Sequence, residues 1–396
     1  MAVHRTYEEI NDKIKSGKVV VVTAEEMVAM GMRDGAAAAA KKVDVVTTAT
    51  FGPMCSSGAF LNFGHTEPPI RMTRVWLNDV PAYAGIAAVD CYIGATEESE
   101  TQGQRYGGAH VLQDLVEGRT IRLRATSPGT DCYPRRSHET EVTLAGLRDA
   151  TLFNPRNCYQ NYGAAANTTD SVLYTYMGTL LPRLGNVSYS TSGQLSPMLK
   201  DPTYRTIGIG TRVYLGGGEG YVAWEGTQHN PEQERSAGGV PVGGAGTLAL
   251  IGDLKTMKPG YLRAATFHRY GVTLYVAIGV AIPVLDEDVA AAAARPETEL
   301  YTAILDYGVP SRNRPALRRV SYAELRSGSV DIDGTEVRTS PVSSYRMARR
   351  IAAELKDMIA AGGFSLTRPV RPLRGAATGT GDVPGLAAAA APGGAI

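Results

Sequence analysis

The chain has 396 residues, 43% of them hydrophobic and 20% charged, which is enough apolar surface for a large core. Its 40 basic and 39 acidic side chains leave a formal charge of +1, so charge predicts neither a nucleic-acid partner nor attraction to an anionic membrane. Four cysteines without CxxC spacing indicate a reducing cytoplasm, and the longest apolar stretch, residues 272–285, is too short to cross a bilayer.

The N-terminal region shows two Thr-x-x-Glu capping boxes. They predict helices over residues 6–16 and 23–42, and β-branched residues predict strands at 19–22 and 43–49. A strand, a helix and a strand within about 30 residues are typical of a parallel crossover. We therefore predict an α/β fold with mixed sheet layers, an N-terminal βαβ unit and long Gly-rich loops.

The middle of the chain is rich in glycine, tyrosine and asparagine, which predicts long functional loops between short strands. The apolar spacing in residues 345–361 predicts an amphipathic helix that ends at Gly362. We expect the last two of the predicted strands to pair as a hairpin. The predicted strands are 206–215, 220–224, 247–251, 262–267 and 272–282.

The C-terminal segment changes composition to Pro, Arg, Gly and Ala. Such a sequence has too few large apolar groups to offset the entropy lost on ordering. We predict a catalytic region over residues 1–365, in one or two lobes, followed by a disordered tail over residues 366–396.

A loop at residues 125–136 combines a thiol with turn formers and positive charge. Pro128-Gly129 and Pro134 predict that Cys132 lies on a loop rather than in a packed element. Nearby positive charge favours the thiolate, the form that attacks electrophiles or carries sulfur. The residues alone leave open whether Cys132 is reactive or a small buried apolar residue. Five arginines lie close in sequence: Arg119, Arg122, Arg124, Arg135 and Arg136.

A glycine-rich segment at residues 51–65 follows the second predicted strand, where ligands bind in many α/β folds. Its Cys55 and His65 would suit a nucleophile and a base, or Cys55 could simply pack. No second Cys or His lies nearby, so we predict no metal site. The remaining thiols, Cys91 and Cys158, are expected to pack, with a resolving thiol as the alternative.

Two histidines lie in polar loop contexts. His138 follows the Cys132 loop, and His229 lies in Thr-Gln-His-Asn-Pro. Imidazole titrates near neutral pH, so either could transfer a proton, or each could simply be solvated or hydrogen-bonded.

Three long segments carry unusual residue combinations: 50–65, Gly129-Thr-Asp-Cys132-Tyr-Pro, and 225–231. Together they resemble the homocysteine biosynthesis family, the L-aspartate semialdehyde sulfurtransferases of methanogens and some anaerobic bacteria. The likeness runs from about residue 5 to residue 365. It implies that Cys132 carries a persulfide, and it places the family's earlier cysteine on Cys55, the second candidate thiol.

The resemblance implies conversion of L-aspartate 4-semialdehyde to L-homocysteine with sulfide and a low-potential reductant. We expect Cys132 to be catalytic, Arg135 or Arg136 to hold the substrate carboxylate, and His138 or His229 to protonate the departing oxygen. No cofactor is expected on this chain, because electrons would come from a separate ferredoxin-like iron–sulfur protein. The other expected partners are a sulfide or persulfide donor and further copies of the chain in a homo-oligomer.

An alternative from another class is a non-catalytic persulfide carrier. Cys132 would then accept sulfur and pass it to a partner enzyme or to iron–sulfur assembly. Many members of the family continue into paired CBS modules, whereas this sequence ends in an Ala/Gly/Pro-rich segment. Regulation by nucleotides through such modules is therefore not expected.

Overall fold

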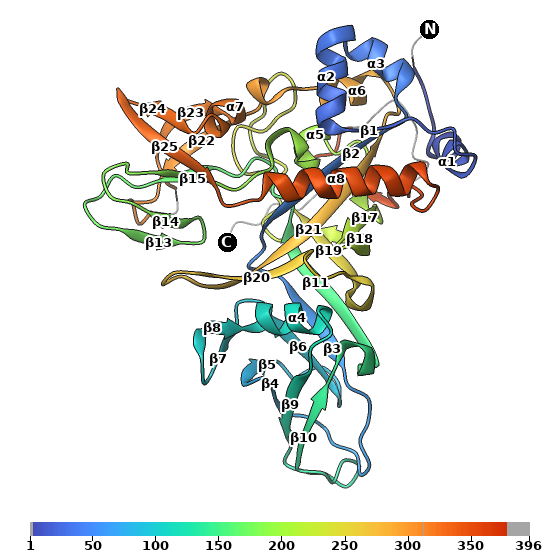
Figure 1. Ribbon diagram of the computed structural model, residues 1–396, viewed down its shortest axis with the longest axis vertical. Coiled ribbons are helices and arrows are strands. Elements are labelled where there is room, and N and C mark those ends of the chain that lie inside the picture. Colours follow the sequence, from blue (N-terminus) through green and yellow to red (C-terminus); the bar gives the residue numbers. More distant parts are fainter. Residues whose placement is uncertain (1–2, 312, 378–396) are drawn as a thin grey trace, which may run out of the picture.

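The computed structural model describes residues 3–311 and 313–377 of the chain and shows an elongated molecule (Figure 1). One long sheet runs through most of its length, in the order β1-β2-β21-β17-β18-β19-β11-β3-β6, with β20 paired to β21. Only the β1/β2 pair of this sheet is parallel. The strands are β1 (Val21–Thr23), β2 (Val45–Pro53), β3 (Gly58–Asn62), β6 (Asp90–Gly94), β11 (Asp149–Asn157), β17 (Arg212–Leu215), β18 (Gly218–Glu225), β19 (Leu248–Asp253), β20 (Leu262–Phe267) and β21 (Gly271–Pro283).

The N-terminal crossover is confirmed, with one correction. Both predicted capping boxes form, at the start of α1 (Tyr7–Lys15) and of α2 (Ala24–Asp34). The second helix was expected to run unbroken to residue 42, and this is wrong. Gly35 has φ of 83°, outside the helical region, so α2 ends there and a separate α3 (Ala36–Lys42) follows.

The predicted C-terminal helix is confirmed as α8 (Tyr345–Ala360), which crosses the face of β2 and β21 (Figure 1). Its residues Ile351 and Leu355 are fully buried in the core that α8 shares with α1 and these strands. The Thr47 hydroxyl of β2 donates a hydrogen bond of 2.8 Å to the Ala352 carbonyl. This layer fixes the strand that leads to Cys55.

Two of the strand predictions have different outcomes. The predicted hairpin forms, because β20 and β21 pair antiparallel along their length. The predicted strand 206–215 is wrong as a single element, because Gly210 has φ of 87° and turns the chain. It divides into β16 (Gly208–Ile209), which pairs with β26 (Arg371–Pro372), and β17 of the long sheet.

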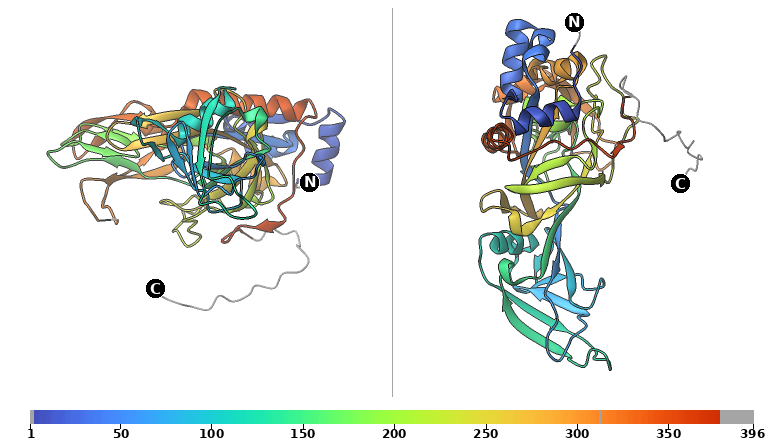
Figure 2. Two further views of the ribbon diagram at one scale, coloured as in Figure 1. Left: turned by 90° about the horizontal axis from the view of Figure 1, so that it is seen from below. Right: turned by 90° about the vertical axis from the view of Figure 1, so that its right-hand side faces the viewer.

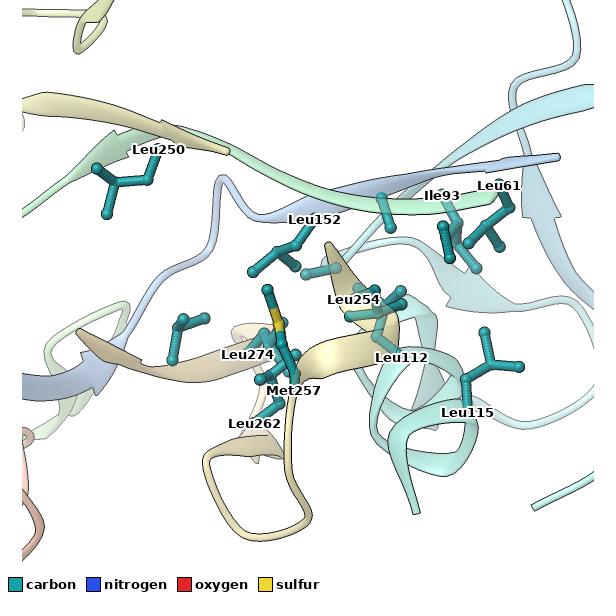
Figure 3. Packing of buried hydrophobic residues seen from close by; sticks show 14 of the residues in the cluster. Leu61, Ile93, Leu112, Leu115, Leu152, Leu250, Leu254, Met257, Leu262 and Leu274 are labelled. Carbon is teal, nitrogen blue, oxygen red and sulfur yellow. The ribbon is translucent and has the colours of Figure 1, made fainter. Parts of the chain in front are cut away.

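The end of the molecule farthest from the N-terminus carries a four-stranded antiparallel sheet in the order β10-β9-β4-β5 (Figures 1 and 2). Leu112 and Leu115 of α4 pack with Leu61, Ile93 and Leu152 of the long sheet (Figure 3), so one core joins this end to the middle. The elements of this end are β4 (Arg74–Leu77), β5 (Val80–Ala82), β7 (Glu98–Ser99), β8 (Gly103–Gly107), α4 (Gly108–Val116), β9 (Ile121–Thr126) and β10 (Ser137–Val142).

A six-stranded mixed sheet, in the order β23-β22-β12-β15-β25-β24, flanks the long sheet and confirms the mixed sheet layers. Its strands are β12 (Ala164–Ala166), β15 (Val187–Tyr189), β22 (Tyr301–Asp306), β23 (Ala316–Ser321), β24 (Ser329–Ile332) and β25 (Thr335–Pro341). The neighbouring elements are β13 (Leu173–Thr175), β14 (Gly178–Leu180), α5 (Pro197–Lys200), α6 (Glu287–Ala293) and α7 (Tyr322–Arg326).

The predicted tail begins inside the folded body. Residues 366–377 were expected to be disordered, but β26 pairs with β16, Leu373 is buried and Arg374 pairs with Glu225 at 2.6 Å. These contacts offset the low apolar content of the segment. Residues 378–396, the rest of the predicted tail, lie outside the described residues. No helix in the described part of the chain is long and apolar enough to span a membrane.

Gly58, which opens β3, offers a test of the packing at the start of the four-stranded end. A β-carbon there would lie 2.6 Å from the Ile93 carbonyl oxygen and would also meet the Tyr92 hydroxyl. We expect Gly58→Ala to destabilise the protein by about 1–3 kcal/mol, because the backbone oxygen cannot move aside easily. Gly94→Ala is the matched control. Gly94 pairs with Gly58 across the two strands, and a β-carbon added to Gly94 would meet open space. Equal midpoints for both variants in urea unfolding would contradict the expectation.

Candidate functional site

Cys132 lies in the loop that joins β9 to β10. This hairpin is at the end of the molecule distant from the N-terminus (Figure 1). The backbone amides of Thr130 and Tyr133 each donate to the carbonyl of the other, at 2.9 and 3.1 Å, which places Cys132 at the corner of a tight turn. The thiol is exposed, as the sequence predicted for a loop cysteine. A buried packing role for Cys132 is therefore excluded.

Arg135 fastens this loop to the neighbouring segment. Its guanidinium donates to the Pro68 carbonyl at 2.9 Å and to the Glu67 carbonyl at 2.6 Å, and it lies 3.2 Å from His138 Nδ1. These contacts occupy the Nε–Nη2 edge of the guanidinium, the edge that would otherwise bind a carboxylate. Arg136 is exposed, and its side chain makes no ion pair within the described residues, so it is the free guanidinium of the loop.

The cluster of five arginines expected around Cys132 does not form. Arg119 pairs with Asp114 at 2.7 Å, Arg122 pairs with Asp79 at 2.6 Å, and Arg124 stacks on the Trp76 ring at 3.9 Å. Strand pairing brings acids and aromatics from distant parts of the sequence to these side chains. Proximity in sequence therefore overestimated the positive charge at the thiol.

The two candidate histidines lie in different places. His138 is the second residue of β10. Burial lowers its pKa, and the positive charge of Arg135 lowers it further. A neutral imidazole at pH 7 can accept a proton but not donate one. His229 is buried far from this loop, with Nε2 at 3.0 Å from the Arg374 carbonyl and Nδ1 at 3.3 Å from the Thr247 amide. Both ring nitrogens of His229 thus contact main-chain atoms, which indicates a structural role.

A hollow of about 490 Å³ opens beside the Cys132 loop. Its lining includes Tyr133 and Arg71, and Tyr133 stacks on His65 with ring centroids 6.3 Å apart. The hollow is large enough for a small ligand. His65 thus contacts Tyr133, the residue after Cys132, whereas the contact of Cys55 is with Thr273.

Cys55 lies in a second place, in the turn after β2 at the middle of the molecule. Its Sγ is 3.3 Å from the Thr273 hydroxyl of β21, and the side chain is half-buried. Tyr270, Tyr275 and Tyr159 lie around the sulfur. Burial raises the pKa of each phenol, and the nearby Cys55 adds to that rise. We call this place the Cys55 recess.

The recess continues into a tyrosine cluster drawn from four separate segments. The Tyr176 and Tyr307 hydroxyls are 2.9 Å apart, and the Tyr176 ring lies edge-on to Tyr270 and Tyr162 at centroid distances of 6.1 and 6.2 Å. The Arg314 guanidinium covers the Tyr307 ring at 3.6 Å and donates to the Tyr176 hydroxyl at 3.4 Å.

The phenols of this cluster differ in acidity. Burial raises the pKa of Tyr162, Tyr270 and Tyr307 well above the ordinary value. Burial opposes ionisation of Tyr176 as well, but hydrogen bonds from Tyr162 and Tyr307 and the Arg314 charge outweigh it and lower its pKa. Sequence reasoning did not find these residues. The signal available was composition, because the chain has 20 tyrosines against 6 phenylalanines.

A small cavity of about 50 Å³ adjoins the recess through Met54 and Tyr159. Hydroxyl side chains line much of it, among them Thr50, Ser196 and Thr191. The Thr191 residue is only 6% exposed, and its hydroxyl has no hydrogen-bond partner among the described residues. A buried hydroxyl without a partner is costly and calls for a ligand or water.

The other thiols pack as expected. Cys91 and Cys158 are buried, and burial raises the pKa of Cys158 to about 12 and that of Cys91 further. Neither forms a disulfide. In residues 3–311 and 313–377 no three His, Cys, Asp or Glu side chains are grouped to hold a metal ion.

The α/β fold thus carries two free thiols outside the core, one exposed on a hairpin and one half-buried in a recess of phenols and guanidiniums. Thiols in such places are suited to cysteine-based chemistry. The chain belongs to the family described as homocysteine biosynthesis enzyme, sulfur-incorporation, whose model matches residues 19–366. The family predicted from the three motifs is therefore confirmed. No solved structure matches the chain.

Two relatives carry a functional name. The chain is 51% identical over 371 residues to the L-aspartate semialdehyde sulfurtransferase of Methanosarcina acetivorans, covering 94% of this chain and 72% of that protein. It is 50% identical over 381 residues to the protein of the same name from Methanocaldococcus jannaschii, covering 92% and 72%. An uncharacterized protein of Methanothermobacter thermautotrophicus is 30% identical over 82% of the chain.

Proposed function

We propose that this protein is an L-aspartate semialdehyde sulfurtransferase, which converts L-aspartate 4-semialdehyde to L-homocysteine. The observation that carries the proposal is the identity of about half of all aligned residues, over more than nine-tenths of the chain, with two enzymes of that name. The exposed Cys132 thiol supports it, because a sulfur carrier must meet a donor protein or sulfide at the surface.

The overall reaction fixes the electron requirement. When sulfide replaces the aldehyde oxygen, the oxygen leaves as water and the carbon is at the thioaldehyde level. Two electrons and two protons then reduce the thioaldehyde to the thiol of homocysteine. A reductant is therefore obligatory, and we propose that a ferredoxin-like iron–sulfur protein supplies the electrons.

In the proposed step, a persulfide on Cys132 supplies the sulfur. The outer sulfur attacks the aldehyde carbon, a C–S bond forms, and the persulfide proton passes to the oxygen. Two electrons and two protons break the S–S bond, which restores the Cys132 thiol and leaves the sulfur on carbon. Loss of water and a second two-electron reduction give homocysteine, so a persulfide donor requires four electrons in place of two.

We propose supporting roles for three side chains around the loop. Arg136 is the free cation next to the thiol, and His138 is placed to accept a proton. Arg135 positions the loop through its bonds to residues 67 and 68. We further propose a homo-oligomer in the cytoplasm, where a reducing environment keeps the four thiols free.

An anaerobic assay tests the function directly. Purified protein is mixed with L-aspartate 4-semialdehyde, sulfide and titanium(III) citrate, and both homocysteine and oxidised titanium are measured. We expect homocysteine with two electrons consumed per molecule, and four when persulfide-loaded protein is the only sulfur source. Transfer of sulfur to a thiol acceptor without any homocysteine would overturn the proposal in favour of the persulfide carrier.

A further inference from the structure

The Cys55 recess holds positive charge that the described residues do not neutralise. The Arg156 carbonyl accepts a hydrogen bond of 3.3 Å from the hydroxyl of Ser56, the residue after Cys55, which sets Arg156 beside the recess. Burial raises the pKa of Tyr159 and of Tyr270, and the Arg156 charge opposes that rise. The Arg156 guanidinium makes no ion pair or hydrogen bond within residues 3–311 and 313–377, although the residue is half-buried. Arg314, on the other side of the tyrosine cluster, has a buried Nε without a partner. Cations held in this way favour an anionic ligand.

We propose that the Cys55 recess binds the amino-acid aldehyde, with Arg156 as the group that holds its carboxylate. This inference rests on the proposed function for the identity of the ligand. A guanidinium matches a carboxylate in shape and charge, and the half-buried position of Arg156 strengthens such a contact relative to one in open water. The Cys132 loop offers a weaker site, because the bonds from Arg135 to residues 67 and 68 occupy its guanidinium and Arg136 is exposed to water.

The rest of the recess suits the remaining groups of such a ligand. The adjoining cavity presents the unpartnered Thr191 hydroxyl, which can bond to a polar group of the ligand. The volume of about 50 Å³ admits only a few atoms, so the recess favours a short side chain. Tyr176 carries the most acidic phenol of the cluster and can give a proton to an oxygen that becomes negative.

The proposal separates the two thiols by task. Cys132 collects sulfur in an exposed loop, and Cys55 lies where the aldehyde is bound. The β9–β10 hairpin lies at the end of the molecule distant from the N-terminus, whereas β2 lies nearer the N-terminal end (Figures 1 and 2). Sulfur therefore reaches the aldehyde through movement of the hairpin or from the hairpin of a second copy.

Protection of Cys55 from alkylation tests the site without turnover. Cys132→Ser protein is treated with iodoacetamide in the presence of L-aspartate 4-semialdehyde or L-homoserine, and Cys55 modification is followed by mass spectrometry. We expect both ligands to slow the modification, and propionaldehyde, which lacks the carboxylate, to have no effect. Arg156→Gln is expected to raise the half-protecting concentration at least about tenfold, with partial recovery in Arg156→Lys.

Arg183→Gln is the matched control, because Arg183 is an exposed arginine paired with Asp170 outside the recess. It is expected to behave like the parent protein. Unchanged protection in Arg156→Gln, or no protection of Cys55 in the parent, would overturn the site. If homocysteine never forms in the assay while Cys55 is still protected, the proposed function fails and the binding site stands.

Discussion

Replacing Cys132 with alanine is expected to lower the rate of homocysteine formation by at least about a hundredfold, because the sulfur then has no covalent carrier. The fold should be unaffected, since the side chain is exposed and the turn is closed by backbone bonds between Thr130 and Tyr133. The measurement is the initial rate with glutathione persulfide as the sulfur donor and titanium(III) citrate as the reductant, together with the thermal midpoint of each protein.

Asp131→Ala is the matched control for this change. Asp131 is exposed, shares the same turn and carries no thiol. We expect it to keep a rate within about threefold of the parent, since surface substitutions away from reacting groups have small effects. A Cys132→Ala protein as active as the parent would show that sulfur is carried elsewhere, with Cys55 as the next candidate.

Replacing Lys200 with methionine is expected to stabilise the protein near pH 6 by about 2 kcal/mol. Lys200 is fully buried in α5, and its ammonium donates to the Arg295 carbonyl. No carboxylate among residues 3–311 and 313–377 forms an ion pair with it. Burial, followed by the Arg295 charge, lowers its pKa from 10.5 to about 7. Burying or deprotonating this amine therefore lowers the free energy of unfolding at neutral pH.

The sign of the pH dependence follows from proton binding. Between about pH 7 and pH 10.5 the unfolded chain holds a proton on Lys200 that the folded chain has released. The contribution of Lys200 to stability thus becomes more favourable as pH rises through this window. The gain from Lys200→Met should be largest below pH 7 and shrink toward pH 10.

Urea unfolding at a series of pH values measures this gain. The exposed Lys18→Met is the control, and it should shift stability by no more than about 0.5 kcal/mol at any pH. A Lys200→Met protein that is less stable than the parent at every pH would show that the Arg295 bond outweighs the cost of burial.

Local signals predicted much of the fold. The capping boxes before α1 and α2 form as read from the sequence, and so does the β20–β21 hairpin, because these structures depend on neighbouring residues. The breaks at Gly35 and Gly210 were missed. Glycine permits a positive φ but does not require it, and the choice is made by packing partners distant in sequence.

The candidate site was only partly predictable for the same reason. Pro128-Gly129 and Pro134 placed Cys132 on a loop correctly, since turn chemistry is local. The charge around it depended on Asp79 and Trp76, which reach Arg122 and Arg124 only when the strands pair. The Cys55 recess likewise assembles tyrosines from separate segments, and no spacing rule predicts that contact.

The position of the persulfide tests the central claim most directly. Trypsin separates the two thiols, because Cys132 falls in residues 125–135 and Cys55 in residues 43–71. After loading with glutathione persulfide, we predict one extra sulfur atom on the 125–135 peptide. That sulfur should disappear on addition of L-aspartate 4-semialdehyde and titanium(III) citrate, with an equal amount of homocysteine formed. A persulfide found only on residues 43–71, or one on Cys132 that persists while homocysteine forms, would contradict the account.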